Sequence, residues 1–398
     1  MRRYATSRFR LGLLIFMLGA VVFTTTYGFA QNAPTTGPAA HGSAVALLIY
    51  TSGTTADAKG VLHSHDTLLA EVRSLGAVHG LDERDVVLMP SPLTHISGIV
   101  HALLVPAVFG TTAVLVDRWE PGDALARIAA EGVTYMVGAP TFLRDLAHHP
   151  ELARHDVRRF RLFSCGGAVV DPTLVREAAA RLDCVAKRVY GSTEFPTITT
   201  TGPDDPPERR VDSEGRAIGA NEVRLVDEMD APVPVGHEGE ILARGPECFL
   251  GYRNPALDAE AFTADGWFRT GDLGTLDAAG YLRITGRRKD IIIRKGENIS
   301  ARELEDLLAA HPAVAEAAIV GLPDAVAGEI ACAVVRLRPG AAPPTLAGVA
   351  EHLTAQGLSR RKLPERLEVV DDFPRTASGK ILKRALKEQL DTAERGKT

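Results

Sequence analysis

The sequence predicts an α/β protein with a layered large domain, which ends in a small β subdomain and is followed by a smaller α+β domain. From Val45 onward, short β-branched apolar runs alternate with helical stretches, as in a layered domain with a largely parallel sheet. Between about Ala217 and Thr285 the pattern changes to short alternating strands with frequent glycine and proline. The last unit, residues 289–398, again mixes strands and helices and has the size of a compact domain.

The elements of the large domain follow in chain order. VALLIY (45–50) is a short apolar run that ends in a hydroxyl-rich turn, which predicts a buried strand. Asp66 is expected to cap a helix over 67–78. Further strands are predicted at 85–90, 111–117, 133–140 and 161–165, with helices such as 122–132 and 172–182 between them.

The remaining elements are shorter strands and two helices. In the β subdomain, strands are predicted at 222–227, 239–245 and 280–286. In the small domain, strands are predicted at 291–296, 315–323 and 331–339, together with an amphipathic helix at 301–311 and a basic helix near the end of the chain.

The first 40 residues differ from everything that follows. Four arginines within the first ten residues precede the uncharged run Leu11–Phe23, and Gly28 and Ala30 stand at positions that a signal peptidase prefers. This pattern matches a secretory signal. The alternatives are a membrane anchor through residues 11–30 and a mis-joined start of the chain. We therefore place a signal-like or anchor segment at 1–30, a linker at 31–42, the large domain at 43–288 and the small domain at 289–398.

Composition excludes several classes of protein. Hydrophobic residues make up 45% of the chain and charged residues 24%, the proportions of an ordinary globular protein. The 45 basic and 50 acidic residues give a net charge of −5, which argues against nucleic acid as a partner. The four cysteines lie far apart without a CxxC pair, so we expect reduced structural thiols and no zinc site or disulfide framework.

The strongest local signal is YTSGTTADAKGV (50–61), where a strand runs into a turn dense in hydroxyls and ends at a lysine. Exposed amides, hydroxyls and an ammonium are the groups that bind a polyphosphate. The spacing is not that of a Walker A loop, and a polar surface loop is the alternative interpretation.

Four weaker motifs follow in order: YGSTE (190–194), WFRTGDL (267–273), GRRKD (286–290) and PRTASGK (374–380). A threonine beside a glutamate at a strand end suits a phosphate and its Mg²⁺. Asp272, predicted to follow a tight Thr-Gly turn, suits the hydroxyls of a ribose; the alternative is an Asx-turn. Taken singly, GRRKD and PRTASGK read as a solvated connector and an exposed loop.

Together, these five motifs in this order resemble the acyl-adenylate-forming superfamily, which includes acyl-CoA synthetases, aryl-acid ligases and the adenylation domains of peptide synthetases. The resemblance runs from about Val45 to Leu386. It implies that a carboxylic acid attacks the α-phosphate of Mg-ATP to give an acyl adenylate and pyrophosphate, and that a thiol, usually coenzyme A, then displaces AMP. Attack by one anion on another requires charge neutralisation and alignment.

The resemblance also assigns roles to single residues. The implied catalytic set is Lys380 bridging the carboxylate and the α-phosphate, Thr193 at the α-phosphate, Glu194 as the Mg²⁺ ligand, and His95 beside the acyl pocket. The implied binding set is Thr51, Ser52, Gly53, Thr54, Thr55 and Lys59 over the β- and γ-phosphates, Gly167, Ala168 and Tyr190 at the adenine, Asp272 and Arg287 at the ribose, Lys289 at the hinge of a mobile small domain, and Gly296 at the pantetheine tunnel.

The neighbours of His95 indicate the kind of acid. They are apolar or small, namely Ile96, Gly98, Gly138, Ala139, Gly166 and Gly191, which suits an uncharged fatty or alicyclic chain. Amino-acid substrates would leave an ammonium unpaired there. We therefore expect a carboxylate–CoA ligase; the alternatives are a ligase that loads an acyl carrier protein and a catalytically impaired remnant.

The chain departs from the family pattern at two places. Ala56 and Ala58 stand in the loop where the family usually has glycine and proline, and alanine resists positive φ more than glycine does. Relatives also carry a subdomain before this loop, and here the signal-like segment stands in its place, so a truncated large domain is expected. Since ATP and coenzyme A are cytosolic, we expect cytoplasmic function, with residues 11–30 as a tether to the membrane.

Overall fold

The computed structural model describes residues 42–51, 58–324, 326–376 and 380–395. The predicted signal-like segment, and the linker up to residue 41, lie outside these described residues. Contacts within the chain define two units. The first runs to Arg224 and includes Leu242–Arg269 and Gly280–Leu282, and the second comprises Leu225–Ile241, Thr270–Ala279 and the chain from Arg283 onward.

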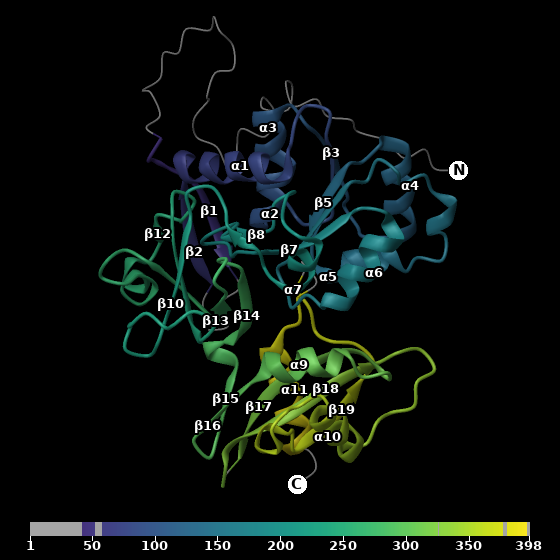
Figure 1. Cartoon of the computed structure of the whole chain (residues 1–398), viewed down its shortest axis with the longest axis vertical. Helices are drawn as coiled ribbons and strands as arrows, with labels where there is room; N and C mark the ends of the chain where they lie inside the picture. The colour runs from purple at the N-terminus through teal and green to yellow at the C-terminus, as the bar shows by residue number, and fades with distance from the viewer. Residues whose placement is uncertain (1–41, 52–57, 325, 377–379, 396–398) are drawn as a thin grey trace, which may run out of the picture. The chain divides into compact units, whose positions relative to one another are not determined.

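The first unit is built on a seven-stranded sheet (Figure 1). Its first five strands are parallel and its last two pair antiparallel. In spatial order they are β4 (Thr112–Leu115), β3 (Val86–Met89), β5 (Tyr135–Gly138), β6 (Leu162–Cys165), β7 (Val185–Tyr190), β8 (Thr199–Thr200) and β9 (Arg216–Ala217). The strands predicted at 85–90, 111–117, 133–140 and 161–165 are therefore confirmed.

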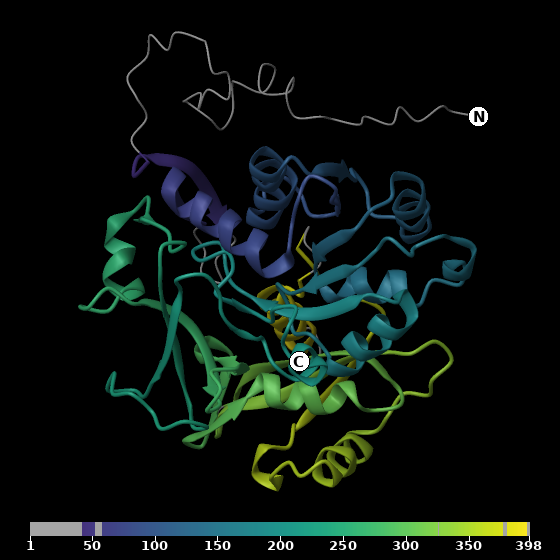
Figure 2. The ribbon, with the colours of Figure 1, turned by 45° about the horizontal axis from the view of Figure 1, so that its top comes forward.

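Helices cover both faces of this sheet. Along β5, Tyr135 and Val137 pack into one apolar cluster and Met136 into the other, because successive side chains of a strand point to opposite faces. One cluster is covered by α4 (Pro121–Glu131), α5 (Pro140–Ala147) and α6 (Pro172–Leu182), and the other by α1 (His65–His79) and the helical run of α2 (Ile96–Ile99), the π-helix η2 (Val100–Leu104) and α3 (Val105–Phe109). This two-sided layering confirms the α/β class, and Figure 2 shows α1 as a blue-violet helix in the first unit.

Helix α1 does not begin as the sequence predicted. Ser64 caps it by accepting from the Thr67 amide, while the Thr67 side chain accepts from the Ser64 amide in return. Asp66 is exposed in the first turn of the helix, so its prediction as the cap was wrong. The reciprocal Ser64–Thr67 pair satisfies two amides that a single cap at Asp66 would leave unpaired.

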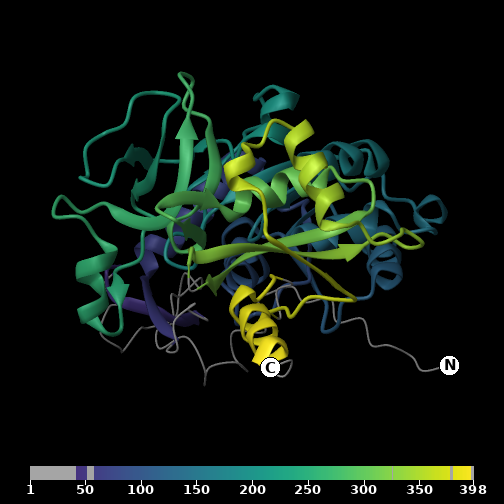
Figure 3. The same cartoon turned by 90° about the horizontal axis from the view of Figure 1, so that it is seen from below.

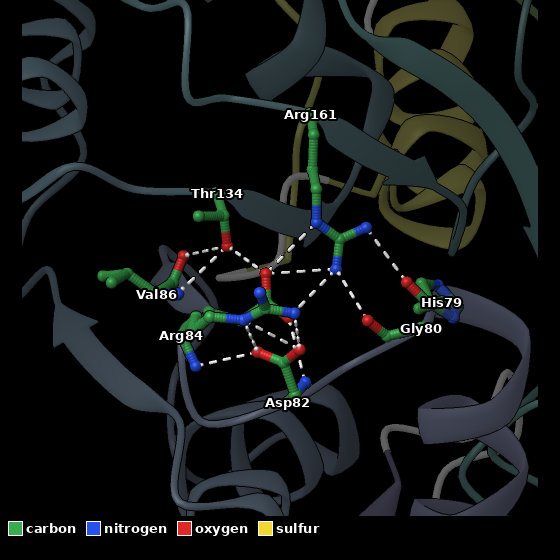
Figure 4. A network of polar contacts seen from close by, with 8 residues as sticks. His79, Gly80, Asp82, Arg84, Val86, Thr134 and Arg161 are labelled. Atoms are coloured by element: carbon green, nitrogen blue, oxygen red, sulfur yellow. Dashed lines mark hydrogen bonds and ion pairs between the residues drawn. The ribbon is translucent and has the colours of Figure 1, made fainter.

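A network of charged and polar groups joins the amino ends of three parallel strands to the end of α1 (Figure 4). Arg161, just before β6, forms an ion pair with Asp85 at 3.0 Å and donates to the carbonyl of His79 at 2.9 Å. The hydroxyl of Thr134, before β5, donates to Asp85 at 2.6 Å. These contacts fix the starts of three parallel strands against the end of α1.

Two smaller sheets complete the chain up to residue 287. The first is antiparallel, in the order β1 (Val45–Thr51), β2 (Lys59–Ser64) and β12 (Gly251–Tyr252). The second has the order β10 (Glu222–Val226), β11 (Glu238–Arg244), β13 (Phe268–Leu276) and β14 (Leu282–Arg287). The predicted strands at 45–50, 222–227, 239–245 and 280–286 are confirmed, but the expected burial of the first was wrong, because Val45, Leu48 and Tyr50 are exposed. Short helices lie between the strands: η3 (Leu152–Arg154), α7 (Pro207–Asp212), η4 (Pro255–Leu257), α8 (Asp258–Ala261) and η5 (Arg288–Asp290).

The C-terminal part of the second unit is an α+β layer. Its five-stranded sheet consists of β16 (Glu297–Ser300), β15 (Ile291–Arg294), β18 (Gly328–Leu337), β17 (Val314–Asp324) and β19 (Arg366–Val370), which pairs with β18. One face packs against α9 (Ala301–Ala309) and α10 (Leu346–Ala355), and the other against α11 (Lys383–Arg395), as Figure 3 shows. A short turn, η6 (Arg360–Lys362), precedes β19. The predicted α+β composition is thus confirmed.

Two further findings concern cysteines and membrane segments. All four cysteines are free thiols, as predicted, and burial raises the pKa of Cys165 and Cys184 to about 12. Within the described part of the chain, no helix has the length and apolar character needed to cross a membrane.

The corrected cap of α1 can be tested by two substitutions. Ser64→Ala is expected to lower the free energy of unfolding by about 1 kcal/mol, because it removes the acceptor of the Thr67 amide. Asp66→Ala should cost less, about 0.3–0.5 kcal/mol, because it removes only a favourable charge in the first turn. Urea unfolding measures both. A larger loss in Asp66→Ala than in Ser64→Ala would restore Asp66 as the cap.

Candidate active site

Most residues that the sequence assigned to the nucleotide and acyl sites follow the carboxyl ends of parallel strands. Gly138 ends β5, Gly167 and Ala168 follow β6, and Tyr190 ends β7. His95 lies six residues beyond the end of β3. Because the carboxyl ends of parallel strands lie at one edge of a sheet, these groups share the edge where open α/β sheets bind ligands.

Two glycines at this edge are required by close packing. A Cβ at Gly191 would lie 2.0 Å from the Pro196 carbonyl oxygen, and a Cβ at Gly166 would lie 2.5 Å from the Val189 carbonyl oxygen. Contacts this short do not occur between folded residues, so only glycine fits. The backbone is thereby drawn tightly together on both sides of Tyr190.

The turn that carries Thr193 and Glu194 is held from several directions. The amide of Phe249 donates to the Glu194 carbonyl at 2.8 Å, and the hydroxyl of Tyr252 donates to Oε1 of Glu194 at 2.8 Å. His63 Nε2 lies 2.8 Å from the carbonyl oxygen of Thr193. Strands β2 and β12 thus fix both the backbone and the carboxylate of the predicted Mg²⁺ ligand.

The protonation state of His63 follows from its partners. The Thr193 carbonyl can only accept, so Nε2 carries the proton, and Nδ1 then accepts from the Thr67 hydroxyl at 3.1 Å. Burial lowers the pKa of His63, which keeps the ring neutral in this arrangement. His63 is therefore a structural support of the turn and carries no charge toward a phosphate at neutral pH.

Lys59 and Thr51 stand opposite each other at the end of the β1–β2 pairing from which the connecting segment leaves. The ammonium of Lys59 lies 4.8 Å from the ring centre of Tyr252, a cation–π distance. Lys59, Tyr252 and Glu194 therefore form one cluster within the first unit. The other predicted loop residues, Ser52, Gly53, Thr54 and Thr55, together with Ala56, lie outside the described residues.

His95 caps the N-terminus of α2. Its Nδ1 accepts from the Ser97 amide at 3.3 Å and lies 2.8 Å from the Ser97 hydroxyl. With Nδ1 acting as acceptor, the neutral ring carries its proton on Nε2. The helix that His95 caps continues into the π-turn Val100–Leu104, an irregularity that is frequent near functional sites.

The second unit contains the predicted ribose-binding pair. Asp272 is buried, and Arg287 Nε donates to its Oδ1 at 2.5 Å. The prediction that a tight turn precedes Asp272 was wrong, because Thr270 and Gly271 lie inside strand β13. Gly271 has φ +72°, and the Asp272 amide donates to the Thr270 hydroxyl at 3.1 Å. A local distortion of the strand therefore orients Asp272.

The segment that carries Lys380 is anchored at both ends within the second unit. Upstream, Arg375 donates to both carboxylate oxygens of Glu316. Downstream, the ammonium of Lys383 lies 2.7 Å from Glu305 and 3.5 Å from Asp290. The Lys380 amide donates to the Thr376 hydroxyl at 3.1 Å.

The charge environment of Lys380 is unusual for a lysine. The guanidinium of Arg287 lowers the pKa of Lys380 to about 8, against the opposing carboxylates of Asp272 and Asp290. A lysine with this pKa remains largely protonated at neutral pH and becomes neutral as the pH rises above about 8. Arg287, Asp272 and Lys380 therefore interact electrostatically within one unit.

The two remaining predicted residues lie on turns of the second unit. Lys289 is exposed in η5, and Gly296 forms the β15–β16 turn together with Lys295. Lys295 and Gly296 have φ of +51° and +81°, the left-handed pair of a two-residue hairpin turn. The geometry of this turn explains Gly296 without any ligand.

Tyr252 and the supporting role of His63 were not predicted from the sequence. Both contact residues of the YGSTE motif that lie 58 and 130 positions away in the chain, and no local pattern indicates such pairings. Among the described residues, no three His, Cys, Asp or Glu side chains gather in a way that could hold a metal ion. Glu194 thus offers a single carboxylate. Proteins usually supply only one or two carboxylate ligands to a Mg²⁺ ion that is bound mainly through substrate phosphates.

Comparison with known proteins gives the family that the chain resembles. The sequence profile of the AMP-binding enzyme family matches residues 15–253, and that of the AMP-binding enzyme C-terminal domain matches residues 303–380. The first match begins inside the segment that reads as signal-like. The chain is 38% identical to the medium-chain fatty-acid–CoA ligase of Escherichia coli, covering 89% of this chain and 63% of that protein.

Solved structures agree with this result. ATP-bound MatB from Rhodopseudomonas palustris superimposes with a TM-score of 0.81 at 33% identity, covering 88% of this chain and 69% of that one. The o-succinylbenzoate-CoA synthetase MenE from Bacillus subtilis, in complex with its acyl-adenylate intermediate, gives a TM-score of 0.77 at 31% identity and covers 87% and 70%. The chain thus spans somewhat less than two thirds of the length of the E. coli ligase. It spans somewhat more than two thirds of the length of each of these two structures.

The support of Glu194 by Tyr252 can be tested by Tyr252→Phe. Hydrogen bonds to charged groups contribute about 1.5–3 kcal/mol, so loss of this one should weaken Mg-ATP binding about tenfold. Isothermal titration calorimetry measures the change. Tyr281→Phe is the matched control, because the Tyr281 hydroxyl donates at 2.6 Å to another carboxylate of the same unit, Asp205. Equal losses in both variants, or none in Tyr252→Phe, would contradict the assigned support.

Proposed function

This chain belongs to the AMP-binding enzyme family, and from that premise we propose that it activates a carboxylic acid with Mg-ATP and passes the acyl group to coenzyme A. AMP and pyrophosphate are the other products. The observation that carries the proposal is the turn at Thr193 and Glu194, whose backbone and carboxylate are held by His63, Phe249 and Tyr252. A fixed carboxylate at a phosphate-binding strand end suits adenylate chemistry.

In the first half-reaction, the chain has to align two anions and neutralise the charge between them. Glu194 holds Mg²⁺, which when bound withdraws charge from the phosphate oxygens. Thr193 donates to the α-phosphate, and Thr51 and Lys59, with the intervening loop, bind the β- and γ-phosphates. Asp272 and Arg287 bind the ribose, while Gly167, Ala168 and Tyr190 flank the adenine. These residues bind and orient, and no general base is required.

Lys380 supplies the remaining positive charge. Its ammonium contacts both the substrate carboxylate and the α-phosphate oxygen that gains charge, and it is worth more there than in water. The Arg287 guanidinium, which lowers the pKa of Lys380 to about 8, also sets an upper pH limit on adenylation. Below about 8 the ammonium is mostly protonated, and above it the positive charge is progressively lost.

In the second half-reaction, the small domain turns about Lys289, and the segment around Gly296 lines the path of the pantetheine thiol. The acid is a fatty or alicyclic one, because the residues expected near His95 are small and apolar and an acidic partner for an ammonium is missing from the sequence LTHIS. The similarity to a medium-chain fatty-acid–CoA ligase supports this choice. Both co-substrates are cytosolic, so we place the reaction in the cytoplasm.

The proposal is tested by acid-dependent pyrophosphate release. The chain from Gln31 onward and its Lys380→Ala variant are assayed with Mg-ATP and acetate, hexanoate, decanoate, palmitate, benzoate or cyclohexanecarboxylate, with and without coenzyme A. We expect release with a fatty or alicyclic acid, stimulation by coenzyme A, and a loss of at least about 100-fold in Lys380→Ala, since one fixed charge in such a site contributes about 3 kcal/mol.

The outcomes separate the alternatives. If the adenylate turns over only with a holo-carrier protein, the acyl acceptor is the carrier protein and not coenzyme A. Binding of ATP by a folded chain without any acid-dependent release would contradict ligase activity and leave a nucleotide-binding remnant. A Lys380→Ala variant as active as the wild type would contradict the role of Lys380.

A further inference from the structure

Two glutamates lie face to face in the interior of the first unit, outside the residues considered so far. Glu71, on α1, is 1% exposed, and Glu247, just after β11, is 0% exposed. They share neighbours, because Thr197 contacts Glu71 and Asn221 contacts both Thr197 and Glu247. Two ionised carboxylates without a bound cation would repel strongly in such an environment, so their protonation state must differ from that of exposed glutamates.

One oxygen of each carboxyl group accepts a hydrogen bond from a neighbouring side chain, and the other oxygen does not. Oε1 of Glu71 accepts from the Thr197 hydroxyl at 2.7 Å, and Oε2 of Glu247 accepts from Asn221 Nδ2 at 2.7 Å. Oε2 of Glu71 and Oε1 of Glu247 are buried and have no hydrogen-bond partner in the described part of the chain. One proton between the two carboxyl groups would satisfy both of these oxygens.

The surrounding groups supply no charge that could replace this proton. Ser74 faces the pair from α1, Thr197 from the segment after β7 and Asn221 from the start of β10, and all three are uncharged. Cys248, adjacent to Glu247, is a thiol whose pKa burial raises to about 12. Burial likewise raises the pKa of both glutamates, and for Glu71 the charge of Glu247 adds to it.

Two glycines pack closely against the residues that surround the carboxyl pair. A Cβ at Gly219 would lie 2.2 Å from the Ser74 hydroxyl and 3.2 Å from Oε1 of Glu247, and a Cβ at Gly245 would lie 2.2 Å from Oδ1 of Asn221. The geometry leaves little space for the two carboxyl groups to move apart. Loss of the shared proton would therefore displace the segments that carry them.

These segments are the ones that hold the Glu194 turn. Thr197, which donates to Glu71, lies three residues after Glu194, and its carbonyl also accepts from Asn221 Nδ2 at 3.2 Å. Glu247 lies two residues before Phe249, whose amide donates to the Glu194 carbonyl at 2.8 Å. The carboxyl pair thus joins α1 to the two chain segments on either side of Glu194.

We infer that Glu71 and Glu247 share one proton and act as positioning residues for the Thr193–Glu194 turn. While the proton is present, the pair holds the segments at Thr197 and Phe249 together, and Glu194 is kept in place for Mg-ATP. When the proton is lost at higher pH, the two carboxylates repel and Mg-ATP binding weakens. The inference deepens the proposed function and rests on it only for the role of Glu194.

Glu71→Gln tests the shared proton. The glutamine amide donates permanently to the ionised Glu247, so the variant no longer needs the proton. In the wild type, the unfolded chain releases this proton near the ordinary pKa of glutamate while the folded chain retains it, so stability falls as the pH rises. Between about pH 5 and about pH 8, the melting temperature of the wild type should therefore fall relative to that of Glu71→Gln.

Mg-ATP affinity and infrared spectra give two independent readouts. The Kd of Mg-ATP should rise with pH in the wild type, by at most about tenfold per pH unit because one proton is lost, and should stay flatter in Glu71→Gln. The wild type should show the carbonyl stretch of a protonated carboxyl group at neutral pH, and the variant should lack it. Glu247→Gln should show the same changes as Glu71→Gln, and it provides the same test if Glu71→Gln does not fold. Glu260→Gln, an exposed glutamate of α8, is the control and should follow the wild type.

The results decide the inference separately from ligase activity, since none of these readouts needs turnover. Parallel melting curves for wild type, Glu71→Gln and Glu247→Gln, together with no protonated carboxyl band, would overturn the shared proton. A pH-dependent melting difference with identical Mg-ATP affinities would overturn the positioning role. Failure of acid-dependent pyrophosphate release, with these results as expected, would count against the proposed function alone.

Discussion

The hydrogen bond from the Tyr252 hydroxyl to the Glu194 carboxylate, 2.8 Å long, is the contact on which the candidate active site of the first unit depends. It joins two segments, β12 and the turn after β7, which no local pattern of the sequence connects. Burial and the nearby Glu194 charge raise the pKa of Tyr252, so the hydroxyl remains a donor at any ordinary pH. The neutral ring of His63 and the amide of Phe249 hold the same turn through its backbone. A carboxylate held in this way requires little reorganisation when a metal–phosphate group binds, which is the condition for strong electrostatic catalysis.

In the second unit, the lysine with a proposed role in catalysis, Lys380, lies outside the helices and strands. Ion pairs at both ends of the segment, Arg375 with Glu316 and Lys383 with Glu305 and Asp290, fix the loop to the sheet and to α9. Arg287 connects the segment electrostatically to Asp272, since it is paired with Asp272 and lowers the pKa of Lys380. Positive charge is thus concentrated near the residue that we propose contacts the substrate carboxylate and the α-phosphate.

Much of the fold could be predicted from the sequence, because strand and helix patterns are local. The parallel strands, the strands at 45–50, 222–227, 239–245 and 280–286, and the α+β composition of the small domain agree with the apolar runs and periodicity, whereas the short strands β8, β9, β12 and β16 and the strands β2, β13 and β19 were not predicted. The cap of α1 was assigned to the wrong residue, because Asp66 and Ser64 are both good capping residues and only the reciprocal bond with Thr67 decides between them. The distortion at Gly271 was taken for a turn, because a glycine beside a threonine has the same sequence signature in both. Tyr252 was missed because Glu194 lies 58 residues away, and the carboxyl pair was missed because Glu71 and Glu247 lie far apart in the chain; such long-range contacts leave no trace in a single sequence.

The central claim is that the oxygen of a carboxylate attacks the α-phosphate of ATP. Its most direct test is to supply a medium-chain fatty acid labelled with oxygen-18 in its carboxyl group, together with Mg-ATP and coenzyme A, and to analyse the AMP by mass spectrometry. Attack at the α-phosphate followed by thiol displacement leaves one labelled oxygen in each AMP formed. Unlabelled AMP, or ADP as the nucleotide product, would contradict the account.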